Sequence, residues 1–137
     1  GHTIEPMSVD FGDMIEPFTI LWRTQTDVGI PPFFLDKVNR SLWLKAKFTR
    51  AARYVRAMQQ LQTFARSVVS LFDTVDVLLL PTYLHPAIRV GEWKSLSPAR
   101  TLEKIIQWIA PCPAFNVSGL PAINLPAGFD QNGVPLG

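Results

Sequence analysis

The chain has 137 residues, of which 47% are hydrophobic and 18% are charged, and these proportions exclude an intrinsically disordered polypeptide. Its net charge of +2, from 13 basic and 11 acidic side chains, is too small to indicate a nucleic-acid partner. We expect neither a membrane span nor a secretory signal, because the apolar runs fall well short of the roughly 18 residues that a spanning helix requires. A single cysteine excludes an intrachain disulfide and favours a reducing, cytoplasmic location.

The first third of the chain carries a weak structural pattern and a strong charge pattern. Residues 1–10 predict a turn followed by a short strand, and an aromatic-rich segment without a clear period follows them. A break is expected at Gly29 and residues 31–32, where two prolines stand together. Acidic side chains dominate up to residue 36, whereas residues 37–66 hold eight cations and no acid. We therefore expect these two segments to attract each other.

The strongest helical pattern covers residues 50–72, with the hydroxyl of Thr49 as the expected N-cap. Apolar side chains recur on one face of this segment, and arginine, glutamine, threonine and serine fill the opposite face. A basic amphipathic helix can also lie on a membrane surface or bind calmodulin. We favour a core-facing helix with solvated arginines.

The second half of the chain predicts short elements separated by prolines. Residues 75–82 form an apolar run without alternation, which is typical of a strand buried on both faces. A helix is predicted over residues 97–108 because it opens with Ser-Pro, the favoured order of N-cap and first helical residue. A second strand is expected at residues 122–125, and the turn sequence at 130–133 predicts half of a hairpin. These elements indicate an incomplete α/β chain.

Few residues in the sequence suit catalysis. Cys112, His85 and Asp76 have the residue types of a thiol hydrolase, which needs a nucleophile beside a base. Cys112, however, stands between two prolines and outside any predicted helix N-terminus, so we favour an unreactive thiol. The histidines, His2 and His85, belong to no metal-binding cluster, so we expect no metal site and no cofactor. The residues alone therefore predict no self-sufficient active site.

Three stretches of sequence carry a family resemblance. Residues 114–137 read AFNVSGLPAINLPAGFDQNGVPLG, residues 72–82 read FDTVDVLLLPT, and the chain opens with GHTIE. In this order the three stretches resemble the C-terminal region of the amidase signature family, and the resemblance is most specific from residue 76 onward. Most motif positions are expected to be architectural rather than to contact substrate: Asp76, Pro81, Asn116, Gly119, Pro121, Pro126 and Gly128. Gly119 suits a sharp turn from a short helix into a strand, with the Asn116 side chain available to bond the backbone of that turn.

The resemblance implies a fold and a mechanism. The fold would be α/β, with a mixed β-sheet core and covering helices, incomplete in this chain; residues 1–137 would be the C-terminal portion of one amidase domain without an internal boundary. The mechanism would be hydrolysis of a carboxamide by a serine, a cis-serine and a lysine, with backbone amides holding the oxyanion. The chain has no Gly-Gly-Ser-Ser-Gly stretch and no two adjacent serines. We therefore expect the catalytic residues to lie N-terminal to it and the isolated chain to be inactive.

The resemblance also implies a pocket and partners. The predicted wall of the acyl pocket is the apolar set before the motif: Ile106, Ile109, Cys112 and Phe115. The expected partners are a small-molecule amide and the N-terminal remainder of the domain, with a homodimer left open and no nucleic acid or membrane. Residues 101–109 differ from the family's glutaminyl-tRNA-forming subunit, which favours a general amidase. The alternative is a noncatalytic module or amidotransferase-like subunit that pairs with another chain, because unpaired strands would expose a sheet edge.

Overall fold

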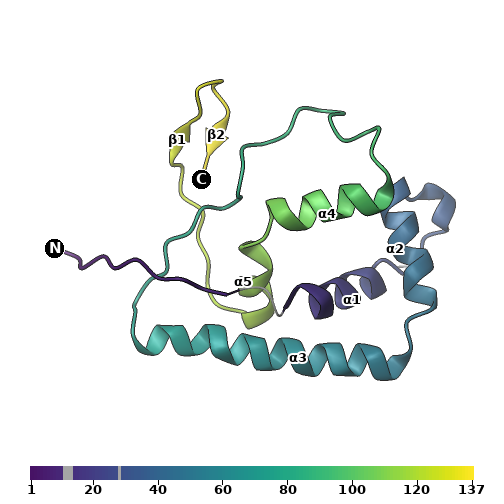
Figure 1. The fold of residues 1–137 in the computed structure, drawn as a ribbon, viewed down its shortest axis with the longest axis horizontal. Coiled ribbons are helices and arrows are strands. Elements are labelled where there is room, and N and C mark those ends of the chain that lie inside the picture. The colour runs from purple at the N-terminus through teal and green to yellow at the C-terminus, as the bar shows by residue number, and fades with distance from the viewer. Residues whose placement is uncertain (11–13, 28) are drawn as a thin grey trace.

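A computed structural model describes residues 1–10, 14–27 and 29–137. The strands in these residues are β1 (Gly128–Phe129) and β2 (Pro135–Leu136), which pair antiparallel. Figure 1 shows the helices gathered in one layer, from which the β1–β2 hairpin and the N-terminal segment project. The helices and 3-10 turns are α1 (Ile15–Gln25), η2 (Pro32–Phe34), α2 (Lys37–Lys47), α3 (Ala51–Ser70), η3 (Leu71–Asp73), α4 (Pro98–Trp108) and α5 (Cys112–Ser118).

The long helix predicted over residues 50–72 is confirmed as α3 and the η3 turn that follows it. The predicted N-cap is wrong, because Arg50 occupies the cap position and the Thr49 hydroxyl instead donates to the Lys45 carbonyl at 3.0 Å. Thr49 lies two residues beyond the end of α2, and its side chain bonds back to that helix. None of the helices in the described part of the chain is both long and apolar enough to cross a membrane.

The core lies where α1, α3 and α5 meet (Figure 1). Leu61 and Val68 are buried on the inner face of α3, and Ala114 of α5 is completely buried against them. Met14, just before α1, closes this cluster, and further apolar side chains pack around it: Phe18, Leu21, Phe64, Phe115, Val117 and Leu120. Burial of this apolar surface holds the three helices together.

The expected attraction between the acidic and basic segments is confirmed by two ion pairs. Glu16 of α1 accepts from Arg53 of α3 at 2.9 Å, and Asp27 accepts from Lys47 of α2 at 2.6 Å. Both pairs are solvent-exposed, so they contribute little to stability. They orient helices that the apolar core stabilises.

Side-chain caps define the ends of α2 and α4. Asp36 accepts from the backbone N–H groups of Val38 at 2.8 Å and Asn39 at 3.1 Å, so α2 begins directly after it. Ser97 accepts from Arg100 N–H at 3.3 Å, which confirms the predicted start of α4. Helix α2 itself, like α1, was not among the predicted elements.

The predicted strands at residues 75–82 and 122–125 are wrong, as is the short strand within residues 1–10. Residues 75–82 are extended, but Val77 and Leu79 are 79% and 88% exposed. A strand requires a neighbour that pairs with its N–H and C=O groups, and the described residues supply no such ladder here. The two extended segments do touch, because the Thr82 hydroxyl donates to the Asn124 side chain at 2.6 Å.

The predicted turn at residues 130–133 is confirmed. The Asp130 carboxylate accepts from the backbone N–H groups of Val134 and Asn132, each at 2.8 Å, and these bonds hold its pKa below the usual range. Both flanking strands are present, so this end of the chain is a whole hairpin rather than half of one. Helices with a small antiparallel sheet are compatible with the predicted α/β class, and the mixed β-sheet core stays a prediction.

Candidate functional site

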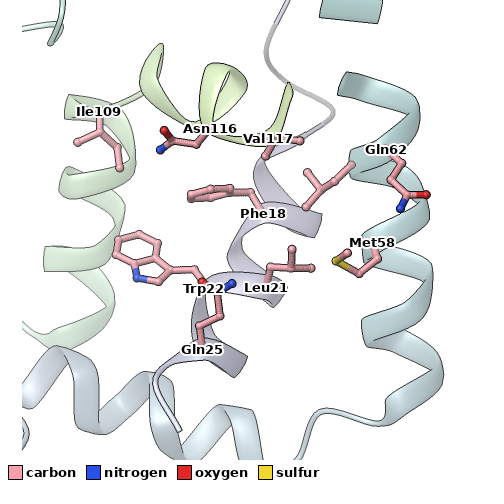
Figure 2. A pocket seen from close by; sticks show the side chains of 10 residues that line it. Phe18, Leu21, Trp22, Gln25, Met58, Gln62, Ile109, Asn116 and Val117 are labelled. Carbon is pink, nitrogen blue, oxygen red and sulfur yellow. The ribbon is translucent and has the colours of Figure 1, made fainter. Parts of the chain in front are cut away.

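A cavity of about 420 Å³, here termed the central pocket, lies between α1, α3 and α5 (Figure 2). Helix α1 contributes four lining residues at helical spacing, so one face of α1 lines the cavity. Helix α3 lines the opposite side, and the end of α4 with α5 lines the third. The lining residues are Phe18, Leu21, Trp22, Gln25, Met58, Leu61, Gln62, Ile109, Asn116 and Val117.

Three of the residues that line the central pocket carry an exposed carboxamide, and a fourth, Trp22, carries an indole N–H. Gln25, Gln62 and Asn116 belong to α1, α3 and α5, and Figure 2 shows them on three different sides of the apolar walls. Each carboxamide is neutral and can both donate and accept a hydrogen bond. No charged side chain is among the described residues that line this cavity. The central pocket therefore suits an uncharged ligand that has an apolar body and a group able to exchange hydrogen bonds with an amide.

A second cavity, here termed the side pocket, has a volume of about 250 Å³ and lies between α1 and α4. Its walls are almost wholly carbon, and one of them, Leu84, comes from the loop between α3 and α4. Phe18 and Ile109 line both cavities. The lining residues are Met14, Ile15, Phe18, Thr19, Leu84, Ile106, Gln107, Ile109, Ala110 and Pro113.

The four residues predicted to wall an acyl pocket divide into two pairs. Ile106 and Ile109 both line the side pocket, and Ile109 also reaches the central pocket. Cys112 and Phe115 are not among the lining residues of either cavity. Phe115 packs against the core, and the Cys112 thiol donates to the Thr82 carbonyl at 3.2 Å. The structure thus brings the two isoleucines together at the side pocket, whereas Phe115 lies against the core and Cys112 against the segment that contains Thr82.

The thiol hydrolase hypothesis has no supporting geometry. Contrary to the prediction, Cys112 does stand at a helix N-terminus, because α5 begins there. Burial nevertheless raises the pKa of its thiol, so the reactive thiolate is disfavoured. The ring of His85 stacks on Trp108 at 5.4 Å, and its Nδ1 lies 2.8 Å from the Pro86 carbonyl oxygen. No Cys112–His85 pair therefore exists in the described residues, and Asp76 is exposed.

Gly119 has the predicted turn conformation. It ends α5 with φ +69°, and its N–H donates to the Phe115 carbonyl at 3.0 Å. Asn116 was expected to bond the backbone of this turn, but its side chain lines the central pocket (Figure 2). The remaining motif residues lie on exposed parts of the chain: Asp76, Pro81, Pro121, Pro126 and Gly128.

Sequence reasoning missed most of the central pocket. Phe18, Trp22 and Gln25 stand at i, i+4 and i+7, and Leu21 fills i+3, which is the spacing of one helical face. That period predicts α1 and its inward face. The same reasoning could not have found Gln62, because only the position of α1 makes that edge of α3 a pocket wall.

A family model for amidases matches residues 17–137, which include every lining residue of the central pocket. The chain belongs to the amidase family. This amidase chain is 41% identical, over 99% of its length, to a protein of Synechocystis sp. that is provisionally named an amidase. It is 35% identical, over 92% of its length, to an amidase of Pseudomonas putida. It is 38% identical, over its whole length, to a protein of Mycobacterium bovis provisionally named amidase AmiA2.

The amidase chain covers only part of these relatives. It spans 27% of the Synechocystis and Pseudomonas proteins and 29% of the Mycobacterium protein. No solved structure matches the chain significantly. The family assignment therefore rests on sequence, and the two cavities are what the structure adds to it.

Proposed function

We propose that this chain is the C-terminal portion of an amidase that hydrolyses carboxamide C–N bonds, and that the central pocket receives part of the amide substrate. The observation that carries this proposal is a neutral, apolar cavity with three carboxamides, formed wholly by residues that match the amidase family. A carboxamide substrate is itself neutral and both donates and accepts hydrogen bonds. Carboxamide side chains complement such a substrate without the desolvation cost of a buried charge.

The proposed chemistry uses a serine, a cis-serine and a lysine N-terminal to this chain. The serine oxygen attacks the carbonyl carbon while the neutral lysine, acting through the second serine, takes the serine proton. The C–N bond then breaks, and the nitrogen receives that proton and leaves as amine or ammonia. Water hydrolyses the serine ester to release the carboxylate and regenerate the serine. Residues 1–137 contribute walls and hydrogen bonds to this reaction rather than a catalytic group.

The primary test compares the complete open reading frame with residues 1–137 alone. We expect the complete protein to release ammonia or amine from aliphatic and aromatic amides, and the isolated chain to release none. A folded complete protein that hydrolyses none of these amides would overturn the proposed activity. Turnover by the isolated chain would overturn the proposed location of the catalytic residues.

A pair of glutamines on α3 tests the role of the central pocket. Both glutamines are exposed, but Gln62 is among the residues that line the cavity and Gln60 is not. In the complete protein, Gln62→Met should raise KM for the amide by about tenfold, the value of one hydrogen bond to a neutral group. Gln60→Met should leave KM unchanged. Equal effects of the two substitutions would remove the central pocket from substrate binding.

We also propose that the N-terminal remainder of the amidase domain covers the exposed apolar side chains of the extended segments. Val77, Leu79 and Ile123 are 79%, 88% and 83% exposed, and Leu125 and Phe129 are 62% and 73% exposed. Large apolar side chains exposed in this number favour association in water. Sedimentation should therefore show self-association of residues 1–137 and a dispersed complete protein. A dispersed, monomeric isolated chain would contradict this proposal.

A further inference from the structure

We propose that the side pocket is a distinct binding site for an aryl or short alkyl group, and that Phe18 and Ile109 separate it from the central pocket. If the central pocket holds the carboxamide, as the proposed function requires, this partition limits the hydrocarbon length that the amidase accepts. The role in substrate selection rests on the proposed function. The binding of an apolar group does not.

The walls of the side pocket define the chemistry of its ligand. Met14, Ile15, Leu84 and Ile106 present hydrocarbon or thioether surface to the cavity. Thr19 and Gln107 also line it, but the Thr19 hydroxyl already donates to the Ile15 carbonyl at 2.7 Å and very little polar surface faces the cavity. A charged or strongly polar group would lose its hydration there without adequate compensation. The side pocket opens to solvent, since its walls Leu84 and Ile15 are 57% and 48% exposed, and its volume of about 250 Å³ exceeds the roughly 150 Å³ of a cavity that binds benzene. It therefore has room for an aryl ring or a short alkyl chain.

Phe18 and Ile109 form the partition that the two cavities share. Phe18 comes from α1 and Ile109 from the end of α4, and both residues line both pockets. On one side of them lies a cavity with three carboxamides, and on the other lies a nearly pure hydrocarbon cavity. An amide held by the carboxamides would direct a long apolar substituent against these side chains. Shortening Ile109 should join the two cavities and admit a longer substituent.

Contacts between Trp108 and residues 83–85 hold Leu84, which forms the outer wall of the side pocket. The Leu84 N–H donates to the Trp108 carbonyl at 3.0 Å, and Trp108 Nε1 donates to the His85 carbonyl at 2.9 Å. The rings on either side of Leu84 also contact Trp108, with centroid distances of 4.9 Å to Tyr83 and 5.4 Å to His85. These contacts fix Leu84 while Trp108 itself is not among the residues that line the cavity. Trp108 is therefore a positioning residue for this wall.

The test uses the complete protein and a series of primary amides with alkyl and phenylalkyl substituents of increasing length. We expect Ile109→Ala to raise the ratio of kcat/KM for long over short amides by about tenfold, within the range that one methylene contributes in an apolar pocket. Leu84→Trp, which fills the cavity, should lower the same ratio by a similar factor. Leu44→Ala on α2 is the control, because Leu44 is about as exposed as Leu84, at 50% against 57%, but lines neither cavity. In Leu44→Ala the ratio of kcat/KM for long over short amides should equal that of the unmodified protein.

A binding measurement separates this inference from the proposed function. Toluene should raise the Tm of the complete protein, and this increase should be lost in Leu84→Trp and retained in Leu44→Ala. Leu84→Phe provides a smaller filling substitution if the tryptophan variant does not fold. Trp108→Phe keeps an aromatic ring but removes the Nε1 donor to the His85 carbonyl. It should weaken toluene binding although it adds no side chain to the cavity.

The outcomes are distinguishable. Amide hydrolysis with an unchanged length profile in Ile109→Ala, together with undiminished toluene binding in both Leu84 variants, would overturn the inference and leave the proposed function intact. A toluene effect that both Leu84 variants abolish, in a protein that hydrolyses no amide, would support the site and overturn the proposed function.

Discussion

Apolar side chains are buried in the core of the helical layer but exposed in the extended segment at residues 75–82. Leu61 and Val68 on α3 are 3% and 2% exposed, whereas Val77 and Leu79 are 79% and 88% exposed. A helix pairs its backbone groups within its own segment, so its apolar face needs only a packing partner. An extended segment needs a neighbouring strand before its backbone is satisfied. Residues 1–137 therefore build a helical core by themselves, but they leave this apolar run without a sheet.

The largest expected effect is a difference between the two regions when one leucine is shortened in each. In residues 1–137, Leu61→Ala should lower the free energy of unfolding by about 2–5 kcal/mol because it opens a cavity in the core. Leu79→Ala should change it by less than about 0.5 kcal/mol because that side chain is already solvated. Urea unfolding measures both. In the complete protein, a large cost for Leu79→Ala would show that other residues cover it, whereas a small cost would contradict the proposed cover.

The next effect concerns Gly119, which ends α5 and begins the extended segment. Gly119→Ala should destabilise the protein by about 1–2 kcal/mol, because an alanine is strained at a φ of +69°. The added Cβ would meet no atom within 4 Å, so the cost comes from the backbone rather than from a clash. Gly119→Asn should cost less, since asparagine tolerates the left-handed conformation better. Equal losses for the two variants in thermal unfolding would contradict this explanation.

Capping of α2 by Asp36 gives a smaller effect. Asp36→Ala should lower the free energy of unfolding by about 0.5–2 kcal/mol, because it leaves two backbone N–H groups of the first turn without their side-chain acceptor. Asp36→Asn keeps an acceptor and should retain most of the stability. Far-ultraviolet circular dichroism during urea unfolding measures both variants, and a neutral Asp36→Ala would show that water replaces the cap.

The Asp36 carboxylate should also make the free energy of unfolding depend on pH. Partial burial acts to raise the pKa of Asp36, but hydrogen bonds from Asn39 and Val38 outweigh it and hold the pKa below its ordinary value. The carboxylate therefore contributes stability above the pKa that it has in the unfolded chain, and this contribution is lost as the pH falls through its folded pKa. Asp36→Asn should remove this part of the acid sensitivity. An identical pH profile in both proteins would exclude the effect.

The smallest expected effect is that of the exposed Glu16–Arg53 pair. Glu16→Gln should cost less than about 1 kcal/mol, and salt should reduce that cost further because both side chains are solvated. Glu5→Gln in the exposed N-terminal segment is the matched control and should have no effect. A large, salt-insensitive loss would mean that this ion pair holds α1 on α3 more firmly than the apolar core does.

The sequence predicted the elements whose signals are local. The period of α3, the Ser-Pro start of α4, the Gly119 turn and the hairpin turn at residues 130–133 each depend on side chains within a few positions of one another. The predictions failed at residues 75–82 and 122–125, where the apolar pattern was present but the pairing partner was not. The signal for α1 existed in the spacing of its pocket-lining residues and was hidden by the surrounding aromatics.

The amidase assignment was within reach of the sequence, because the motif around Asn116 and Gly119 is contiguous and its order along the chain is specific. Only the tertiary structure decided that Asn116 meets Gln25 and Gln62 around one cavity, and that Phe18 and Ile109 stand between two. Local propensity and motif order are properties of neighbouring residues. A pocket is a property of helices that meet from distant parts of the chain, and its shape is set by how their buried faces pack together.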